Sequence, residues 1–300
     1  MTSNLPTTVW VTGAAGQLGA AVLAATPPGT RALGLAHADL DLTCQGDITR
    51  RMSEATPDYI INCGAYTAVD AAESDRDAAF AVNRDGVRNL ALACQATATQ
   101  VIHISTDFVF AGDAVAPYQP SAQTAPINVY GASKLAGEEA LLSCLPSRAM
   151  VVRTAWIYSA IRSNFLLTML RLMAERGTVS VVDDQTGSPT HSKSLARALW
   201  QVVQSGIACT GIHHYRDDGE MTWYGFARHI RDAAVARGVI GGADIQPVTS
   251  ADFPTDAQRP RYSVLDCESL RARYGVSQSA FADELAEVID ELANAPSESA

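Results

Sequence analysis

The stretch TVWVTGAAGQLG, residues 8–19, contains the clearest fold signal in this sequence. An apolar run over Thr8–Thr12 meets glycines at positions 13, 16 and 19, and an alanine-rich segment continues to Ala25. This order predicts a strand, a tight turn and a helix. Glycines at such a turn let the backbone approach a pyrophosphate, which then rests on the positive end of the helix dipole. Because the spacing is G-x-x-G-x-x-G rather than G-x-G-x-x-G, the prediction of a dinucleotide site depends on this position after a first strand.

Further apolar runs along the chain alternate with helical patterns. The run at 58–62 is nearly all apolar, as a strand buried on both faces should be. No hairpin signal separates the runs, so the alternation predicts an α/β fold with a doubly wound parallel (Rossmann) sheet. The expected strands are Thr8–Thr12, Arg31–Ala36, Asp58–Asn62, Val101–Ile104 and Met150–Thr154, and the expected helices include Arg76–Cys94 and Asn128–Leu142.

Beyond Trp156 the alternation of strands and helices weakens. We predict a Rossmann domain over residues 1–155, to which a strand and a helix from about 178–205 return (Thr178–Val182 and Ser192–Gln204). Residues 156–293 are predicted to form mainly a smaller C-terminal substrate-binding lobe, and 294–300 a disordered tail.

Composition limits the class of partner. The 300 residues have a formal net charge of −10, which argues against a nucleic-acid partner because phosphate binding needs a basic face. The six cysteines are scattered without a C-x-x-C motif, as in proteins of a reducing compartment. No apolar run approaches the length of a membrane span, and Met1–Thr8 lacks the features of a signal peptide. We therefore expect a cytoplasmic protein without a membrane partner.

The segment APINVYGASKLAGE, residues 125–138, places Tyr130 four residues before Lys134. On a helix these side chains share one face and lie one turn apart. A nearby ammonium favours the phenolate, so the pair can produce a phenol that donates a proton near neutral pH. Tyr-x-x-x-Lys pairs are also common on protein surfaces. However, the chain has only two lysines, Lys134 and Lys193, beside nine tyrosines, so a chance pairing at this spacing is rare and a catalytic pair is favoured.

Polar side chains also follow two of the expected strands. Ser105 and Thr106 come after the fourth strand and either share a substrate oxygen with the phenol or cap the next segment. His37, Asp39 and Asp41 come after the second strand, where the adenosine ribose of a dinucleotide usually binds. A carboxylate there accepts a hydrogen bond from the ribose 2′-OH of NADH and repels the 2′-phosphate of NADPH, whereas a histidine does neither decisively. The choice between NADH and NADPH therefore stays open, and each acid is also a candidate helix cap.

Seven segments together resemble the extended short-chain dehydrogenase/reductases and, within them, the dTDP-4-dehydrorhamnose reductase family. The glycine turn and Tyr-x-x-x-Lys are shared by the whole superfamily, whereas AYTAVDxAE, RTxW and DQxGxPT are far more specific to this reductase family. The resemblance covers Val9 to about Leu292. The segments are TGAAGQLG (12–19), AYTAVDAAE (65–73), STDFVF (105–110), APINVYGASKLAGE (125–138), RTAWIY (153–158), DDQTGSPT (183–190) and RPRYSVLD (259–266).

The resemblance implies a role for each matching residue. Thr106, Tyr130 and Lys134 are implied as the catalytic set, and Asn83 as a structural, cofactor-side asparagine. The implied cofactor-binding residues are Gly13, Gly16, Gln17, Leu18, Gly19, His37, Asp41, Leu42, Gly64, Ala65, Tyr66, Ser105, Tyr130 and Lys134. The implied substrate-binding residues are Thr67, Val69, Thr106, Trp156, Gln185 and Arg259.

The resemblance also implies an activity. It is the reduction, by NADPH or NADH, of the C4 ketone of dTDP-4-dehydro-L-rhamnose to dTDP-L-rhamnose, with a dTDP-sugar as the partner. Two alternatives remain: a 4-ketoreductase of another dTDP-4-keto-deoxysugar, of the antibiotic-sugar or dihydrostreptose type, and a non-catalytic regulatory subunit of the methionine adenosyltransferase type. The intact Thr106, Tyr130 and Lys134 argue against the second alternative.

Three departures from the family pattern qualify these expectations. The family's Asn-Ala-Ala-Ala is Asn-Cys-Gly-Ala at 62–65, and His37 stands where many relatives have an arginine. Some relatives bind Mg²⁺ through glutamates at a dimer interface, and the corresponding positions here are Ala21 and Lys193. A lysine cannot ligate a divalent cation and would repel it. We therefore predict no Mg²⁺ or other metal, and a monomer or weak homodimer.

Overall fold

A six-stranded parallel sheet forms the centre of the protein in the computed structural model, which describes residues 6–295. Every neighbouring pair of strands runs in the same direction, so the predicted doubly wound Rossmann sheet is confirmed. The strand order is β10 (Gly211–His214), β5 (Ala149–Thr154), β4 (Gln100–Thr106), β3 (Tyr59–Asn62), β1 (Thr7–Thr12) and β2 (Thr30–Leu35).

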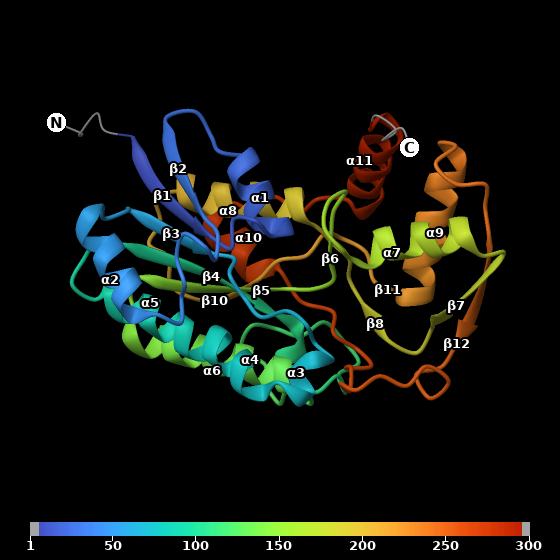
Figure 1. Cartoon of the computed structure of the whole chain (residues 1–300), viewed down its shortest axis with the longest axis horizontal. Coiled ribbons are helices and arrows are strands. Elements are labelled where there is room, and N and C mark those ends of the chain that lie inside the picture. Colours follow the sequence, from blue (N-terminus) through green and yellow to red (C-terminus); the bar gives the residue numbers. More distant parts are fainter. Residues whose placement is uncertain (1–5, 296–300) are drawn as a thin grey trace.

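Helices cover both faces of this sheet (Figure 1). On one face lie α1 (Gln17–Ala24), α8 (Ser192–Gln204) and α10 (Glu268–Tyr274), and on the other α2 (Gln45–Glu54), α5 (Val87–Cys94) and α6 (Val129–Cys144). In β1, Val9 and Val11 pack toward α1 and α8, whereas Trp10 packs toward α2 and α5. Side chains alternate between the faces of a strand, and both faces are buried, so the strands are apolar at nearly every position.

The chain between β3 and β4 is helical but not a single α-helix. The predicted helix Arg76–Cys94 is divided into α4 (Arg76–Phe80), a π-helical turn η1 (Ala81–Gly86) and α5, and a short α3 (Ala71–Ser74) precedes it. A π turn inserts one extra residue and is often found at functional sites. Here the turn contains the buried Asn83, whose side chain binds a neighbouring loop rather than its own helix.

The second, smaller lobe has its own hydrophobic core. It consists of α7 (Phe165–Glu175), α9 (Trp223–Ala236) and α11 (Phe281–Asn294), packed with β7 (Thr178–Val182) and β12 (Asp244–Val248). Its other strands form two-residue ladders, β6 (Ile157–Tyr158) with β9 (Thr190–His191) and β8 (Thr186–Gly187) with β11 (Met221–Thr222).

One predicted return to the Rossmann domain is wrong. Thr178–Val182 pairs with β12 in the lobe, and it is β10, at 211–214, that closes the central sheet beside β5. The burial of β7 alternates, as in a strand with one face on a core, whereas β3 and β5 inside the central sheet are buried at every position. The predicted return of the helix Ser192–Gln204 agrees with the structure, because α8 packs on α1.

Asn294, predicted to begin a disordered tail, is the last residue of α11, and 296–300 lie outside the described residues, as do 1–5. Within the described residues, no helix combines the length and apolar character needed to cross a membrane.

Candidate active site

A cavity of about 880 Å³ opens at the carboxyl ends of the central strands, where the lobe meets the sheet. Ligands of doubly wound folds bind at this edge. The cavity is lined by every residue implied as catalytic, cofactor-binding or substrate-binding except Gln185, whose side chain instead donates to Ser250 Oγ at 2.8 Å; Asp39 and Asn83 do not line it either. The structure therefore brings together residues from segments as distant as 13 and 259, but it does not bring Gln185 to them.

The glycine turn between β1 and α1 forms one end of the cavity. Gly13 has φ +64°, and a Cβ there would lie 2.6 Å from the backbone nitrogen of Gly64. A Cβ on Gly19 would lie 2.3 Å from the Gly13 carbonyl oxygen. Gly16 precedes α1 without a capping side chain, so backbone N–H groups at the helix end face the cavity. Backbone N–H groups are exposed at this turn, which lies at the positive end of the α1 dipole, so the turn fits a pyrophosphate.

The rim beyond this turn contains the candidate ribose contacts. Asp41 lines the cavity, and its Oδ1 accepts from the backbone N–H and the hydroxyl of Thr43, at 2.9 and 2.8 Å. These hydrogen bonds hold the pKa of Asp41 below its usual value. Asp39 accepts from the N–H of Ala36 at 2.9 Å and stabilises the turn. The His37 side chain is 85% exposed at this rim.

Asn83 acts on the cavity through the loop after β3. Its Oδ1 accepts from the N–H of Tyr66 at 2.9 Å, and its Nδ2 donates to the Tyr66 carbonyl at 3.0 Å and to Ser133 Oγ at 2.9 Å. Asn83 is fully buried, and Tyr66 lines the cavity. A Cβ on Gly137 would lie 2.0 Å from the Asn83 carbonyl oxygen, so that glycine allows α6 to approach the π turn. The asparagine therefore fixes the backbone on which Ala65, Tyr66 and Thr67 lie.

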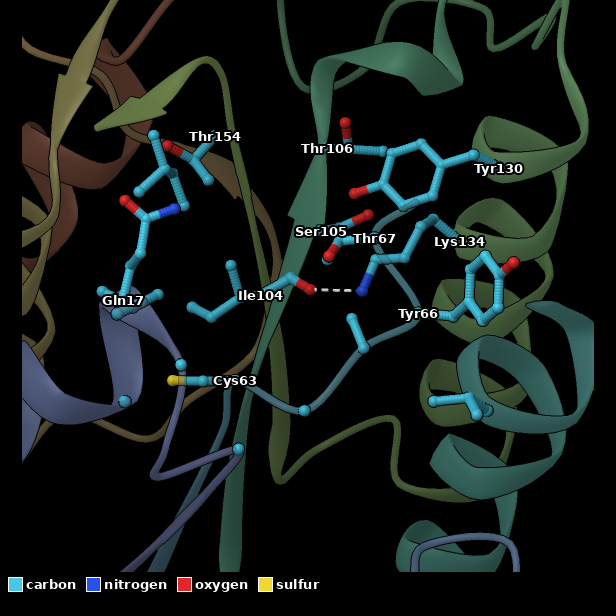
Figure 2. A pocket seen from close by; sticks show the side chains of 18 of the residues that line it. Gln17, Cys63, Tyr66, Thr67, Ile104, Ser105, Thr106, Tyr130, Lys134 and Thr154 are labelled. Carbon is cyan, nitrogen blue, oxygen red and sulfur yellow. Dashed lines mark hydrogen bonds between the residues drawn. The ribbon is translucent and has the colours of Figure 1, made fainter. Parts of the chain in front are cut away.

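Tyr130 and Thr106 meet at the centre of the cavity (Figure 2). Asn128 caps α6 by accepting from the N–H of Gly131 at 2.7 Å, which places Tyr130 in the first turn of that helix. Thr106 ends β4 and accepts from the N–H of Phe108 at 3.2 Å, so it is also a cap. Burial raises the pKa of Tyr130 to about 12, and a hydrogen bond with Thr106 opposes this effect. The phenol is therefore protonated at neutral pH.

Lys134 lies one helical turn beyond Tyr130 and is buried, with 2% exposure. Its ammonium donates to the carbonyl oxygen of Ile104 at 2.7 Å (Figure 2). Burial lowers the pKa of Lys134 to about 8, although the charge of Glu138 acts in the opposite direction. The lysine is thus held at the cavity with a pKa close to neutral, which suits a residue that must hold or give up a proton.

A buried ion pair supports this helix from behind. Arg153 on β5 and Glu138 on α6 are each 2% exposed, and the Nη2–Oε2 distance is 2.6 Å. Ser105 donates to the same carboxylate at 2.5 Å. Ser105 lines the cavity, whereas Glu138 does not. Glu138 on α6 therefore holds the ends of β4 and β5 together from outside the cavity, through Ser105 and Arg153.

Aromatic side chains of the lobe form the opposite side of the cavity. Trp156 has φ +47° and stacks on Trp223, with ring centroids 3.4 Å apart, and Phe165 lies 4.5 Å from Trp223. A Cβ on Gly187 would lie 2.5 Å from the Trp156 ring, so Gly187 makes room for it. All three aromatic side chains line the cavity. Trp223 and Phe165 were not predicted, because their segments show only helix signals; the scarcity of tryptophan, four in the chain, was the one available hint.

Arg259 also lines the cavity. Its guanidinium forms an ion pair with Asp70, with Nη2 2.7 Å from Oδ2, and the hydrogen bonds of Arg259 lower the pKa of Asp70. Thr67 and Val69, between Asp70 and the Tyr66 loop, also line the cavity. A cation, a hydroxyl and an apolar side chain therefore face the cavity together, a set that fits an anionic, partly apolar ligand.

Lys193 lies far from this cavity and pairs with two acids of α11. Its Nζ is 3.2 Å from Glu287 Oε1 and 2.7 Å from Glu291 Oε2. Within residues 6–295, His191, Glu284 and Glu287 form the one group of three potential metal ligands, and Glu284 also pairs with Arg197. Cations already lie against these carboxylates. The predicted lack of Mg²⁺ stays a prediction.

A parallel Rossmann sheet, a glycine turn open to a pyrophosphate and a threonine, tyrosine and lysine at the cavity centre together define a reductase of the short-chain dehydrogenase/reductase class.

Comparison with known proteins narrows this class. A model of the RmlD substrate binding domain matches residues 7–294. A dTDP-4-dehydrorhamnose reductase of Sinorhizobium fredii is 38% identical over 274 residues, which cover 89% of this chain and 91% of that protein. A dTDP-4-keto-6-deoxy-D-glucose reductase of Streptomyces niveus is 39% identical over 265 residues, which cover 87% and 89%. The crystal structure of dTDP-4-dehydrorhamnose reductase from Bacillus anthracis in complex with NADP has a TM-score of 0.89 and 35% identity, covering 95% of this chain and 99% of that one. The chain belongs to the RmlD family.

Proposed function

We propose that this protein reduces the C4 ketone of dTDP-4-dehydro-L-rhamnose to dTDP-L-rhamnose with NADPH or NADH. The observation that supports this most directly is the meeting of Tyr130, Thr106 and Lys134 in one cavity with the glycine turn at one end and aromatic side chains at the other. The family's members named dTDP-4-dehydrorhamnose reductase support the choice of sugar. That the chain is cytoplasmic, and a monomer or weak homodimer, stays a prediction.

The proposed chemistry uses this chain's residues in separate roles. When bound, the nicotinamide cofactor supplies the hydride. Tyr130 donates its phenolic proton to the oxygen that becomes the C4 hydroxyl, and Thr106 donates a hydrogen bond to that oxygen. Two positioned donors then meet the developing negative charge. Because burial makes the phenolate costly, we assign to the Lys134 ammonium, one helical turn further along α6, the role of stabilising it during the transfer.

The remaining residues bind and orient. Gly13, Gly16 and Gly19 hold the pyrophosphate, and the loop fixed by Asn83 borders the ribose next to it. Trp156 and Trp223 provide a flat apolar surface for the deoxysugar. Arg259 supplies positive charge for the diphosphate of the sugar nucleotide.

The test is a turnover assay with NADPH and with NADH on dTDP-4-dehydro-L-rhamnose, with the product identified by NMR. We expect loss of cofactor absorbance and formation of dTDP-L-rhamnose. Turnover with another 4-keto-deoxysugar at higher kcat/KM would favour the first alternative, for which the relative from Streptomyces niveus is the specific motive. No turnover with any keto-sugar, despite dinucleotide binding, would favour a non-catalytic binding subunit.

A further inference from the structure

A buried histidine stands directly behind Lys134. His103 lies in the middle of β4, is fully buried and is outside the cavity. Its Nδ1 is 3.0 Å from Asn62 Nδ2, and its Nε2 is 3.4 Å from Lys134 Nζ. The histidine thus connects the lysine to Asn62 at the end of β3, and the proposed reaction gives it no role.

The hydrogen bonds of Asn62 determine the orientation of its amide. Asn62 Oδ1 lies 3.2 Å from the backbone N–H of Gly64 and 2.6 Å from the hydroxyl of Thr12. A backbone N–H can only donate, so the group that faces Gly64 must be the amide oxygen. Reversing the amide would place an NH₂ group against that N–H. The nitrogen Nδ2 therefore faces His103.

This orientation also determines the tautomer of His103. The Asn62 NH₂ group only donates, so His103 Nδ1 must accept. Burial, and the positive charge of Lys134, lower the pKa of His103 well below its usual value, which keeps the ring neutral. A neutral imidazole with an accepting Nδ1 has its proton on Nε2. That N–H points at Lys134.

Two donors therefore face each other when Lys134 is an ammonium. The distance of 3.4 Å from Nζ to Nε2 is long compared with the 2.7 Å from Nζ to the Ile104 carbonyl oxygen, which is a normal charge-assisted hydrogen bond. An ammonium has no lone pair to offer His103, whereas a neutral amine accepts from Nε2–H and still donates to Ile104. The histidine is thus better matched to the neutral amine.

Other titratable groups also act on Lys134. Glu138, on the same helix, favours the ammonium, and its charge is balanced by Arg153. Cys63, directly after β3, is a half-buried thiol at the cavity whose pKa is raised to about 12 by desolvation, so it is uncharged at neutral pH. Tyr130 is likewise uncharged at neutral pH. His103 is the neighbour that discriminates between the two states of the lysine through a directed hydrogen bond.

We propose that His103 is a positioning residue for Lys134, held by Asn62 with its Nε2–H toward Nζ so that the neutral amine has a partner and the lysine can exchange its proton near neutral pH. The kinetic part of this proposal rests on the proposed reduction. After Tyr130 has protonated the sugar oxygen, Lys134 gives up an Nζ proton that restores the phenol, within the cavity that both side chains line. Lys134 is left as a neutral amine that accepts from His103, and a proton from solvent restores the ammonium.

The first test uses the unmodified protein. Long-range ¹⁵N–¹H spectra of ¹⁵N-histidine-labelled protein distinguish the two imidazole tautomers without any substitution. We expect His103 to be neutral, with its proton on Nε2, over a range of about pH 6 to 9. A proton on Nδ1 would overturn the proposal, because Nε2 would then accept from the ammonium.

The second test measures Lys134 directly. The chain has two lysines, so ¹³C-lysine labelling gives two Cε signals, and Lys193→Arg assigns them. In Asn62→Asp, the carboxylate accepts from Nδ1–H and reverses the tautomer, so the pKa of Lys134 should rise by about one. The added negative charge contributes to this rise. The double variant Asn62→Asp/His103→Leu has the added charge without the imidazole. The pKa of Lys134 in this double variant, compared with that in His103→Leu alone, should rise by less than half as much.

Equal rises in both backgrounds would overturn the proposal, because charge alone would then explain the effect. His213→Leu is the matched control: it removes a buried imidazole from β10 in the same sheet, and the pKa of Lys134 should not change. With turnover established, the alkaline limb of kcat should shift with the pKa of Lys134 at an unchanged KM for the dinucleotide. A failure of the proposed function would remove this kinetic readout and leave both NMR tests intact.

Discussion

The two sides of the cavity are built in different ways. The Rossmann side consists of Thr106, Tyr130 and Lys134, which come from one continuous strand, loop and helix. The lobe side consists of Trp156, Phe165 and Trp223. Trp156 directly precedes β6, and the other two are the first residues of α7 and α9. The first is polar and fixed by hydrogen bonds, and the second is aromatic and fixed by stacking. The groups that we propose as catalytic are thus encoded locally, whereas the surface that we propose to bind the sugar is assembled by tertiary packing.

The largest effect is expected from the Rossmann side, in Tyr130→Phe. Losing the phenolic proton should lower kcat by about 10²–10⁴-fold, because general acid catalysis typically contributes that much. The KM for NADPH should change little. Steady-state kinetics with the keto-sugar measure both quantities.

Tyr158→Phe is the matched control for that variant. The Tyr158 hydroxyl is buried, lies outside the cavity and, within the described residues, has no hydrogen-bond partner, so its removal should leave kcat unchanged. Near-normal turnover in Tyr130→Phe would show that another group donates the proton, and would remove the local encoding on which the comparison depends.

Glu138→Gln tests the support of the same side by its effect on stability. Arg153 would be left buried without its counter-ion, and breaking a buried pair by removing one partner costs about 3–5 kcal/mol. Urea denaturation followed by circular dichroism measures the free energy of unfolding. Glu175→Gln, which breaks an exposed pair with Arg171, should cost at most about 0.5 kcal/mol. Similar costs for the two variants would mean that the Rossmann side does not depend on its buried pair.

The same contrast explains what the sequence could predict. Tyr130 and Lys134 share a helix, and Gly13 lies between a strand and a helix, so local periodicity was enough to find them. The lobe offered no such pattern: β7 and β10 are both short strands, and they differ in the strand with which each pairs, β12 for β7 and β5 for β10. Local propensity cannot distinguish them, because the difference lies in which neighbours cover each face.

The His103 tautomer and the place of Trp223 were also beyond sequence reasoning. The tautomer depends on the backbone N–H of Gly64, which lies two residues after Asn62, whereas His103 lies 41 residues after Asn62. Trp223 follows the helix cap Thr222, and only the packing of α9 against Phe165 turns its ring to the cavity. Such three-body arrangements have no fixed spacing, so no motif reports them.

Trp223→Ala tests the lobe side with a smaller expected effect. Removing one ring of the stack should free Trp156 and lower kcat/KM for the sugar nucleotide about tenfold, mainly through KM, since apolar contacts of this size contribute on the order of 1–3 kcal/mol. The KM for NADPH, measured in the same assays, is the internal control. An unchanged kcat/KM would place sugar selection on the Rossmann side and remove the contrast.

The smallest effect is expected at the rim of the Rossmann side, in His37→Arg. A guanidinium at the end of β2 can pair with the 2′-phosphate of NADPH, so its KM should fall a few-fold, whereas the KM for NADH should not change. The effect should be modest because His37 is 85% exposed and charges there are screened by solvent and salt. His37→Gln, which adds no charge, is the control. The fall in KM for NADPH should become smaller as the salt concentration rises from about 50 to 500 mM. A fall that persists at high salt, or that appears equally with NADH, would mean that the rim is buried in the complex and that its electrostatics resemble those around Lys134.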